Sequence, residues 1–315
     1  MIVAKIMMGL GNQMFQYAAA RSLSLTLNEP FKLDISSYEG YKLRKYELED
    51  FFELSPSIAN KDEMSEFVFS HPVRRAWNKI FPGNRLRSLP YEEKKIARRV
   101  YGIFYIFSPP HKRGVYEERG FHFDNRFFKS NRTVYLKGYW MSYKYFEDHE
   151  VVIKKDFTIR KEKIVHLKEL VEEINGCNSV AVHIRCTDRK DAGNLELYGE
   201  IPASYFKEGI EHIRQKKGNV HLYIFSDDIE LAKGYIPSNL PHTFVSTNIT
   251  KSAIEDLYLM TECKNVVMTN STFSWWAAYL NRHNDKIIIV PERWYNVAPY
   301  NYQDVYYPSW IKIKN

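Results

Sequence analysis

The sequence predicts an α/β protein built from two Rossmann-like domains, and three observations support this. A chain of 315 residues with 44% hydrophobic side chains can bury two cores of roughly 150 residues each. From about residue 178, apolar strands alternate with amphipathic helices, which is the pattern of a doubly wound parallel sheet. The N-terminus opens with strand, helix and strand. We therefore expect two parallel sheets that face each other across a cleft.

The N-terminal half is the less regular of the two. In order, we expect a strand at 2–7, a helix at 13–27, a strand at 31–35, a strand at 133–137 and a helix at 142–149. The C-terminal half should contain strands at 179–185, 220–225, 243–245, 265–268 and 287–290, with helices at 202–217, 251–262 and 272–282. We divide the chain into an N-terminal domain at 1–155 with an insert at about 71–130, a C-terminal domain at 156–290, and a tail at 291–315 that packs back on the N-terminal domain.

Charge is concentrated in one segment. Residues 71–113 contain eleven Lys or Arg against two Glu, and aromatic residues lie between the basic ones. This pattern fits a solvated helical face, a surface that contacts anionic lipid, or a nucleic-acid patch. The charge alone does not distinguish these three interpretations.

Membrane spans, disulfides and structural zinc are not expected. The longest apolar runs are far below the roughly 18 residues that a membrane span requires, and the N-terminus reads as a strand rather than a signal peptide. The three cysteines form no Cys-x-x-Cys pair. We therefore expect a cytoplasmic protein with reduced thiols.

The first candidate site follows the first strand. Gly9, Gly11, Asn12 and Gln13 lie where this strand gives way to a helix, so free backbone N–H groups and the positive end of the helix dipole favour an anion or a sugar. The residues that define a Walker A loop or a dinucleotide fingerprint are missing. The alternative is an ordinary tight turn between strand and helix.

Two further candidates follow strands of the second half. His183 and Arg185 share one face of their strand, and the guanidinium fork of Arg185 suits a diphosphate. Asp227 and Asp228 follow the next strand, where a carboxylate can accept two N–H bonds from a guanine edge. The alternatives are a buried structural His, a surface Arg and a helix-capping Asp.

A run of polar residues opens a later helix: Asn270, Ser271, Thr272 and Ser274. Three hydroxyls exceed what helix capping needs, so we expect them to contact a phosphate. Because the chain has no Asp-x-Asp pair, we expect no divalent metal at the diphosphate.

Five motifs together resemble the bacterial α-1,2-fucosyltransferases of glycosyltransferase family 11. They are Gly9 to Tyr17, Gly138 to Phe146, Val182 to Arg185, Phe225 to Asp228, and Glu255 to Leu257 followed by Asn270 to Trp276. The resemblance implies a GT-B fold, GDP-fucose bound by the C-terminal half, no metal, and inverting transfer to a 2-hydroxyl, commonly of a terminal galactose.

The resemblance also implies residue roles. His183 and Arg185 would contact the nucleotide and its diphosphate, Asp227 or Asp228 the guanosine, and Ser271 to Ser274 the phosphates. The family usually has a second Arg directly after the first, whereas this chain has Cys186 there. We expect Arg189 or Arg21 to replace that charge, or donor preference and rate to differ from the family. Among the carboxylates, Asp188 is the best placed to be the catalytic base.

The sequence thus predicts an inverting, metal-independent galactoside α-1,2-fucosyltransferase that needs no cofactor. One alternative is a transferase with another sugar nucleotide. Another is a protein that binds nucleic acid or anionic membranes through residues 71–113, but it leaves the five motifs unexplained. With GDP-fucose as donor, we expect no nucleic-acid partner. The basic segment would instead contact the inner membrane peripherally, where a lipid-linked glycan acceptor would be found.

Overall fold

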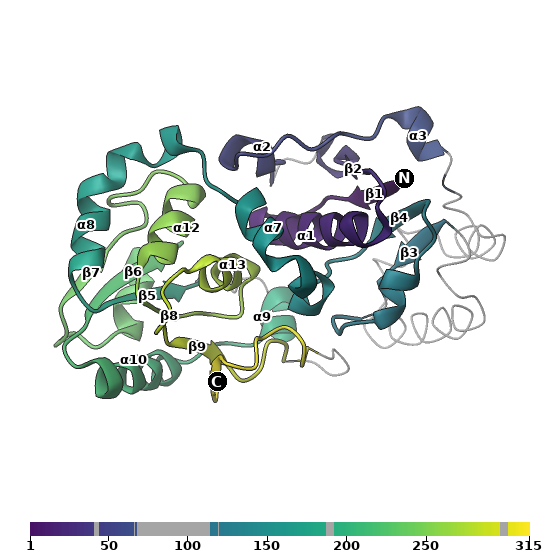
Figure 1. Ribbon diagram of the computed structural model, residues 1–315. Coiled ribbons are helices and arrows are strands. Elements are labelled where there is room, and N and C mark those ends of the chain that lie inside the picture. The colour runs from purple at the N-terminus through teal and green to yellow at the C-terminus, as the bar shows by residue number, and fades with distance from the viewer. Residues whose placement is uncertain (41–43, 66, 68–113, 119, 187–191, 297–301) are drawn as a thin grey trace.

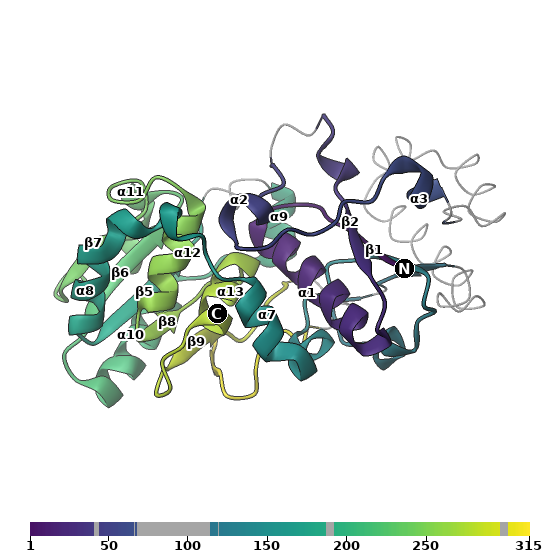
Figure 2. The ribbon, with the colours of Figure 1, turned by 45° about the horizontal axis from the view of Figure 1, so that its top comes forward.

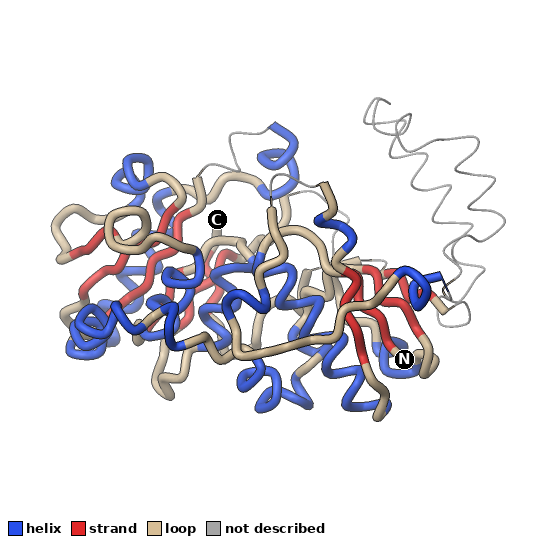
Figure 3. The backbone as a smooth tube through the Cα atoms, turned by 90° about the horizontal axis from the view of Figure 1, so that it is seen from above, coloured by secondary structure: helices blue, strands red, loops and turns tan. Residues whose placement is uncertain are grey.

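The structure is a computed structural model, and it describes residues 1–40, 44–65, 67, 114–118, 120–186, 192–296 and 302–315. Two parallel β-sheets lie at opposite ends of the molecule (Figure 1), and helices lie between them when the molecule is seen from above (Figure 3). One sheet has the strand order β2-β1-β4-β3, and the other has the order β10-β9-β8-β5-β6-β7. These sheets confirm the predicted α/β fold with two Rossmann-like halves.

The first sheet comes from the N-terminal half of the chain. Its strands are β1 (Ile2–Lys5), β2 (Phe31–Asp34), β3 (Val115–Glu117) and β4 (Val134–Lys137). The long helix α1 (Leu10–Leu27) packs on this sheet and is buried along most of its length. It ends at Asn28, whose φ of 51° closes the helix with a left-handed cap.

Short elements complete this half of the molecule. They are α2 (Leu48–Phe51), α3 (Lys61–Ser65), α7 (Glu150–Asp156) and the 3-10 turns η1 (Ser36–Tyr38), η3 (Asn125–Lys129), η4 (Tyr143–Tyr145) and η5 (Glu147–His149). The predicted helix at 142–149 is wrong, because η4 and η5 occupy it and the α-helix begins only at Glu150. Tyr143 and Tyr145 are both buried, a spacing of two that no single helix face provides.

The second sheet and its helices follow after residue 160. Its strands are β5 (Ser179–Ile184), β6 (His221–Ser226), β7 (His242–Phe244), β8 (Asn265–Val267), β9 (Ile288–Pro291) and β10 (Ile311–Ile313). Its helices are α8 (Lys168–Gly176), α9 (Ala192–Tyr198), α10 (Ala203–Lys217), α11 (Ile229–Ala232), α12 (Ala253–Glu262) and α13 (Thr272–Leu280), with 3-10 turns η6 (Lys161–Lys163), η7 (Val165–Leu167) and η9 (Lys233–Tyr235).

Alternate residues of β5 face two different cores. Val180 and Val182 pack with the apolar face of α10, whereas Ala181 faces the core that contains α12 and α13. Burial of both faces explains why this strand is a continuous apolar run in the sequence.

The two halves share one core. The hydrophobic cluster that begins at Ile2 of β1 continues through α1 and α13 as far as Trp310. At the junction, the ring of Phe15 on α1 lies 4.5 Å from Trp275 and 5.0 Å from Trp276 of α13, measured between centroids. Figure 2 shows α1 and α13 side by side between the sheets. The residues at the ends of the strands are therefore held in fixed relative positions across the junction.

The C-terminal tail contacts both halves. Asp304 accepts hydrogen bonds from the backbone N–H of Phe123 and from Lys144, and Tyr307 stacks on Tyr143 with centroids 4.1 Å apart. The tail then adds β10 to the edge of the second sheet beside β9. The sequence analysis did not predict this last strand.

Residues 68–113, and with them most of the predicted basic insert, lie outside the described residues. Within the described part of the chain, no helix is long and apolar enough to span a bilayer.

Candidate functional site

The N-terminus of α1 begins directly after the carboxyl end of β1. Met8, with φ at 71°, turns the chain, and Gly9 precedes the helix without a side-chain cap. Gln13 is fully buried; its amide donates to the carbonyls of Met8 (3.1 Å) and Lys45 (2.7 Å) and its oxygen accepts from an N–H of the 45–47 loop. Gln13 therefore shapes the loop around the helix end, while the half-buried Asn12 remains next to it.

The N-terminus of α13 shows which of the three predicted hydroxyls can meet a ligand. Ser271 caps the helix by accepting from the N–H of Phe273 at 3.3 Å. Ser274 is fully buried and donates to the carbonyls of Thr269 and Ser271. Thr272 is half-buried, and among the described residues its hydroxyl has no hydrogen-bond partner. Thr272 and the backbone N–H groups of the first turn other than that of Phe273 are thus available to an anion.

The N-termini of α1 and α13 meet at Gly11. A Cβ at position 11 would lie 2.6 Å from the backbone carbon of Thr272 and 2.7 Å from the backbone nitrogen of Phe273. The indole N–H of Trp276 donates to the carbonyl of Gly11 at 2.9 Å and joins the two helices. Because both helices present their positive ends here, the junction favours a negatively charged group.

The end of β5 lies beside this junction. His183 is buried, and its ring centroid lies 5.7 Å from that of Phe273 in the first turn of α13. Arg185, two residues further on, is half-buried at the carboxyl end of the same strand. The structure thus brings His183 next to the α1–α13 junction.

The two aspartates after β6 have different surroundings. Asp228 caps α11 by accepting from the N–H of Leu231 at 3.1 Å, which is the structural role left open from the sequence. Asp227 is exposed, and its carboxylate accepts from the N–H of Cys186 at 2.7 Å, which ties the end of β6 to the end of β5. Asp227 is therefore the better candidate for contact with a base.

A half-buried carboxylate on α12 supports the end of β6. The side chain of Asp256 accepts from the hydroxyls of Thr250 and Ser246, and Ser246 in turn accepts from the backbone N–H of Ser226 at 3.1 Å. Burial raises the pKa of Asp256, although these hydroxyls partly offset the effect. The sequence analysis named Asp256 within a motif but assigned it no role; its role in this structure is to position the loop that carries Asp227.

Asn270 connects two loops rather than facing the junction. Its amide nitrogen donates to the carbonyls of Tyr198 (3.1 Å) and Trp294 (2.8 Å). We expect Asn270→Ala to lower the free energy of unfolding by about 2 to 3 kcal/mol, because two buried carbonyls lose this donor. Asn270→Asp should be no better, since a carboxylate cannot donate. Urea denaturation measures the effect, and a change below about 0.5 kcal/mol would contradict this role.

Comparison with known proteins identifies the family of this chain. The model of the family "Glycosyl transferase family 11" matches residues 1–314. The chain belongs to glycosyltransferase family 11. The relatives of this glycosyltransferase include an α-1,2-colitosyltransferase of Escherichia coli, 28% identical over 99% of both chains. The Escherichia coli O-antigen biosynthesis glycosyltransferase WbnK is also 28% identical, over 97% of this chain and 98% of its own.

More distant matches extend this relationship. Galactoside α-(1,2)-fucosyltransferase 2 of Mus musculus is 26% identical over 61% of this chain and 54% of its own length. The solved structure of an Arabidopsis thaliana FUT1 mutant in complex with GDP superposes with a TM-score of 0.50 at 12% identity, and the alignment covers 95% of this chain and 72% of that one. The two-sheet architecture of this family 11 glycosyltransferase is the GT-B fold.

One basic residue at the junction was missed from the sequence. The side chain of Arg44 lies over Gly9, with its Nε 3.8 Å from the position of a Cβ on that glycine. Arg21, one of two predicted replacements for the family's second arginine, instead pairs with Asp156 at 3.0 Å, and it lies roughly 16 Å further along α1. The expectation for Arg21 is therefore wrong. No pattern marked Arg44, because it lies in a loop without periodicity.

Other predicted residues of this glycosyltransferase cannot be placed. Asp188, the predicted base, and Arg189, the other predicted replacement, lie outside the described residues. No cluster of three or more His, Cys, Asp or Glu side chains suited to a metal occurs in the part of the chain that the structure describes.

Proposed function

We propose that this family 11 enzyme transfers L-fucose from GDP-β-L-fucose, with inversion, to the 2-hydroxyl of a glycan acceptor that ends in a β-galactoside. The observation that carries the proposal is the meeting of the α1 and α13 N-termini beside His183. A donor diphosphate fits there because it is the most negative part of a sugar nucleotide. The galactoside fucosyltransferase among the relatives supports the choice of sugar and acceptor.

Each part of the donor has a candidate partner. The diphosphate accepts hydrogen bonds from the N–H groups at the start of α13, from the hydroxyl of Thr272 and from the guanidinium of Arg185. Asp227 accepts from the guanine edge, since a carboxylate matches its two adjacent N–H donors. In this proposal, the helix N-termini and Arg185 neutralise the charge of the diphosphate in place of a divalent cation, so the reaction needs no metal.

The reaction passes through an oxocarbenium-like displacement at the anomeric carbon of fucose. As the bond to the β-phosphate breaks, negative charge accumulates on GDP. Arg185 and the two helix N-termini face that charge and stabilise it more in the transition state than in the ground state. Leaving-group electrostatics therefore supplies most of the rate enhancement.

The acceptor belongs to a surface polysaccharide in this proposal, because one relative is named for O-antigen biosynthesis. The basic residues at 71–113 would hold the enzyme at an anionic membrane where a lipid-linked glycan is presented. Flotation with liposomes tests this part: recovery should increase with anionic lipid, and equal recovery on neutral liposomes would contradict it.

The test of the function is GDP release from GDP-fucose in EDTA, with and without lactose. We expect release that depends on the acceptor and is unaffected by the chelator. Product analysis by NMR then reports the linkage and the anomeric configuration. Loss of activity in EDTA that added Mg²⁺ restores would contradict metal independence, and retention of configuration would contradict inversion.

A second donor sugar is favoured by one relative, the α-1,2-colitosyltransferase. GDP-colitose is therefore compared with GDP-fucose in the same assay. Thermal unfolding with GDP, UDP or ADP tests the nucleotide separately from the sugar. Stabilisation by GDP but not by UDP supports the guanine contact, whereas equal shifts with all three nucleotides would contradict it.

A further inference from the structure

A carboxylate at the carboxyl edge of the first sheet has no role in the site described so far. Glu118 directly follows β3, and its backbone N–H donates to the carbonyl of Lys137 at 2.9 Å, which extends the pairing of β3 with β4 by one residue. Its side chain is half-buried. In parallel α/β sheets this edge is where ligands bind.

The side chain of Glu118 is held in one orientation by the turn after β4. Its carboxylate accepts from the N–H of Tyr139 at 2.6 Å and from the N–H of Trp140 at 3.1 Å. Gly138 makes room for it, because a Cβ there would lie 2.5 Å from the Cβ of Glu118. Trp140 has a φ of 57°, which is an uncommon conformation for a residue other than glycine. These contacts orient the carboxylate before any ligand binds.

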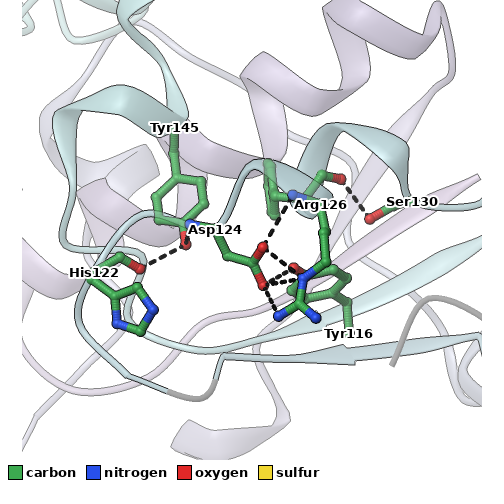
Figure 4. Close-up of polar contacts among 7 residues, drawn as sticks. Tyr116, His122, Asp124, Arg126, Ser130 and Tyr145 are labelled. Atoms are coloured by element: carbon green, nitrogen blue, oxygen red, sulfur yellow. Dashed lines mark hydrogen bonds and ion pairs between the residues drawn. The ribbon is translucent and has the colours of Figure 1, made fainter. Parts of the chain in front are cut away.

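Neighbouring carboxylates pair with cations, whereas Glu118 has no ion pair with any residue that the structure describes. Glu117 pairs with Lys137 at 2.6 Å. Figure 4 shows the carboxylate of Asp124 bonded to the side chains of Arg126 and Tyr116, each at 2.7 Å. Burial alone would raise the pKa of Asp124, but these hydrogen bonds lower it to about 2, so it is a weak proton acceptor.

The groups around Glu118 keep it basic. Burial raises the pKa of its carboxyl to about 7, against the two backbone N–H groups that favour the charged form. The titratable groups that face it are the phenols of Tyr145 on η4 and Tyr295 in the loop after β9, and burial raises the pKa of both well above the usual range. Neither phenol ionises near neutral pH, so among the described residues that face it the carboxylate of Glu118 is the group that titrates there.

Glu118 lies at the same edge of the first sheet as the Gly9 loop. β4 separates β3 from β1, and the strand register puts Glu118 level with Ile6, three residues before Gly9. Because adjacent strands lie about 4.8 Å apart, the backbone at Glu118 is roughly 10 Å from that of Ile6, which leaves the two loops as neighbours at the same edge of the sheet.

We propose that Glu118 is the general base that accepts the proton of the acceptor hydroxyl. This inference rests on the proposed fucosyl transfer. The acceptor oxygen forms the new bond to the anomeric carbon of fucose, and its proton moves to the carboxylate of Glu118. The bond between that carbon and the β-phosphate oxygen breaks, and its electron pair leaves with GDP. The protonated Glu118 then returns its proton to solvent.

Glu118→Gln is the decisive variant, because its amide oxygen still accepts hydrogen bonds from the turn but cannot take a proton. We expect kcat for acceptor-dependent transfer to fall 100-fold or more, while the KM for GDP-fucose and the melting temperature stay close to wild type. The rate of the wild-type enzyme should rise with pH through about 7, since the base must be deprotonated. The variant should not show that rise.

Three further variants make the result unambiguous. Glu117→Gln is the matched control, and it should keep both the rate and the pH profile. Glu118→Asp retains the carboxylate, so it should keep the pH dependence at a reduced rate even if the Gln variant fails to fold. Asp188→Asn tests the alternative that Asp188 is the general base.

The outcomes separate this inference from the function on which it rests. If wild type transfers fucose but Glu118→Gln retains more than a third of its kcat with an unchanged pH profile, Glu118 has only a positioning role and the inference fails. If only Asp188→Asn removes the pH dependence, Asp188 is the base. If wild type transfers no fucose to any acceptor, the proposed function fails and the assignment of Glu118 fails with it.

Discussion

Gly11→Ala should impair the use of GDP-fucose and destabilise the fold. The new methyl group would lie 2.6 Å from the backbone of Thr272, so the N-termini of α1 and α13 would have to separate. We expect the free energy of unfolding to fall by about 2 to 3 kcal/mol. A displacement of about 1 Å at the diphosphate would lower kcat/KM for GDP-fucose roughly 100-fold. Helix propensity alone predicts the opposite sign, because Ala stabilises a helix relative to Gly by about 1 kcal/mol.

Gly176→Ala is the matched control for this prediction. Gly176 is the last residue of α8, and a Cβ there would meet no atom within 4 Å. We expect this variant to unfold and turn over like wild type within a factor of about three. Equal effects of the two substitutions, measured by urea denaturation and steady-state kinetics, would contradict the close contact of the two helices.

Arg185→Ala should cause the largest loss of activity without a loss of fold. If its guanidinium stabilises the charge that accumulates on GDP, kcat should fall by 10² to 10³, or about 2.7 to 4 kcal/mol of transition-state stabilisation. Arg185→Lys should recover part of the rate, because an ammonium group keeps the charge but loses the planar fork. Steady-state kinetics with GDP-fucose measures both effects.

The control is Arg214→Ala, which removes an exposed guanidinium paired with Glu211 on α10. It should leave kcat unchanged. Thermal unfolding of all three variants shows whether any loss is due to the fold. Turnover of Arg185→Ala at the wild-type rate would exclude Arg185 from the chemistry.

Long apolar runs could be predicted from the sequence because both of their faces are buried. β5 occupies 179–184 as expected, and the helices at 203–217 and 272–280 begin within one residue of the prediction. The strands at 115–117 and 311–313 were missed, because three residues carry almost no period. Gly11 was read as part of a turn, yet it lies inside α1, where contact with α13 rather than local propensity requires a glycine.

The candidate site could be predicted only in part from the sequence, because side-chain contacts depend on the fold. Residue type and position after a strand marked the starts of α1 and α13 as candidate sites, but they did not show that the two helices meet at Gly11. They could not show that the hydroxyl of Ser274 points into its own turn, or that the amide of Asn270 holds two loops. Glu118 carries no motif of its own, and its importance follows from the burial and backbone contacts that the fold provides.

The hydrogen bond between Trp276 and Gly11 has a consequence for protein engineering. Chimaeras that exchange the second half of the chain between relatives, with the aim of changing donor preference, break an aromatic interface as well as a binding site. Phe15 contributes to this interface from α1, although it belongs to the first half by sequence. The exchangeable unit is therefore the C-terminal half together with α1, and a chimaera that leaves α1 behind should need compensating substitutions around Phe15 to remain active.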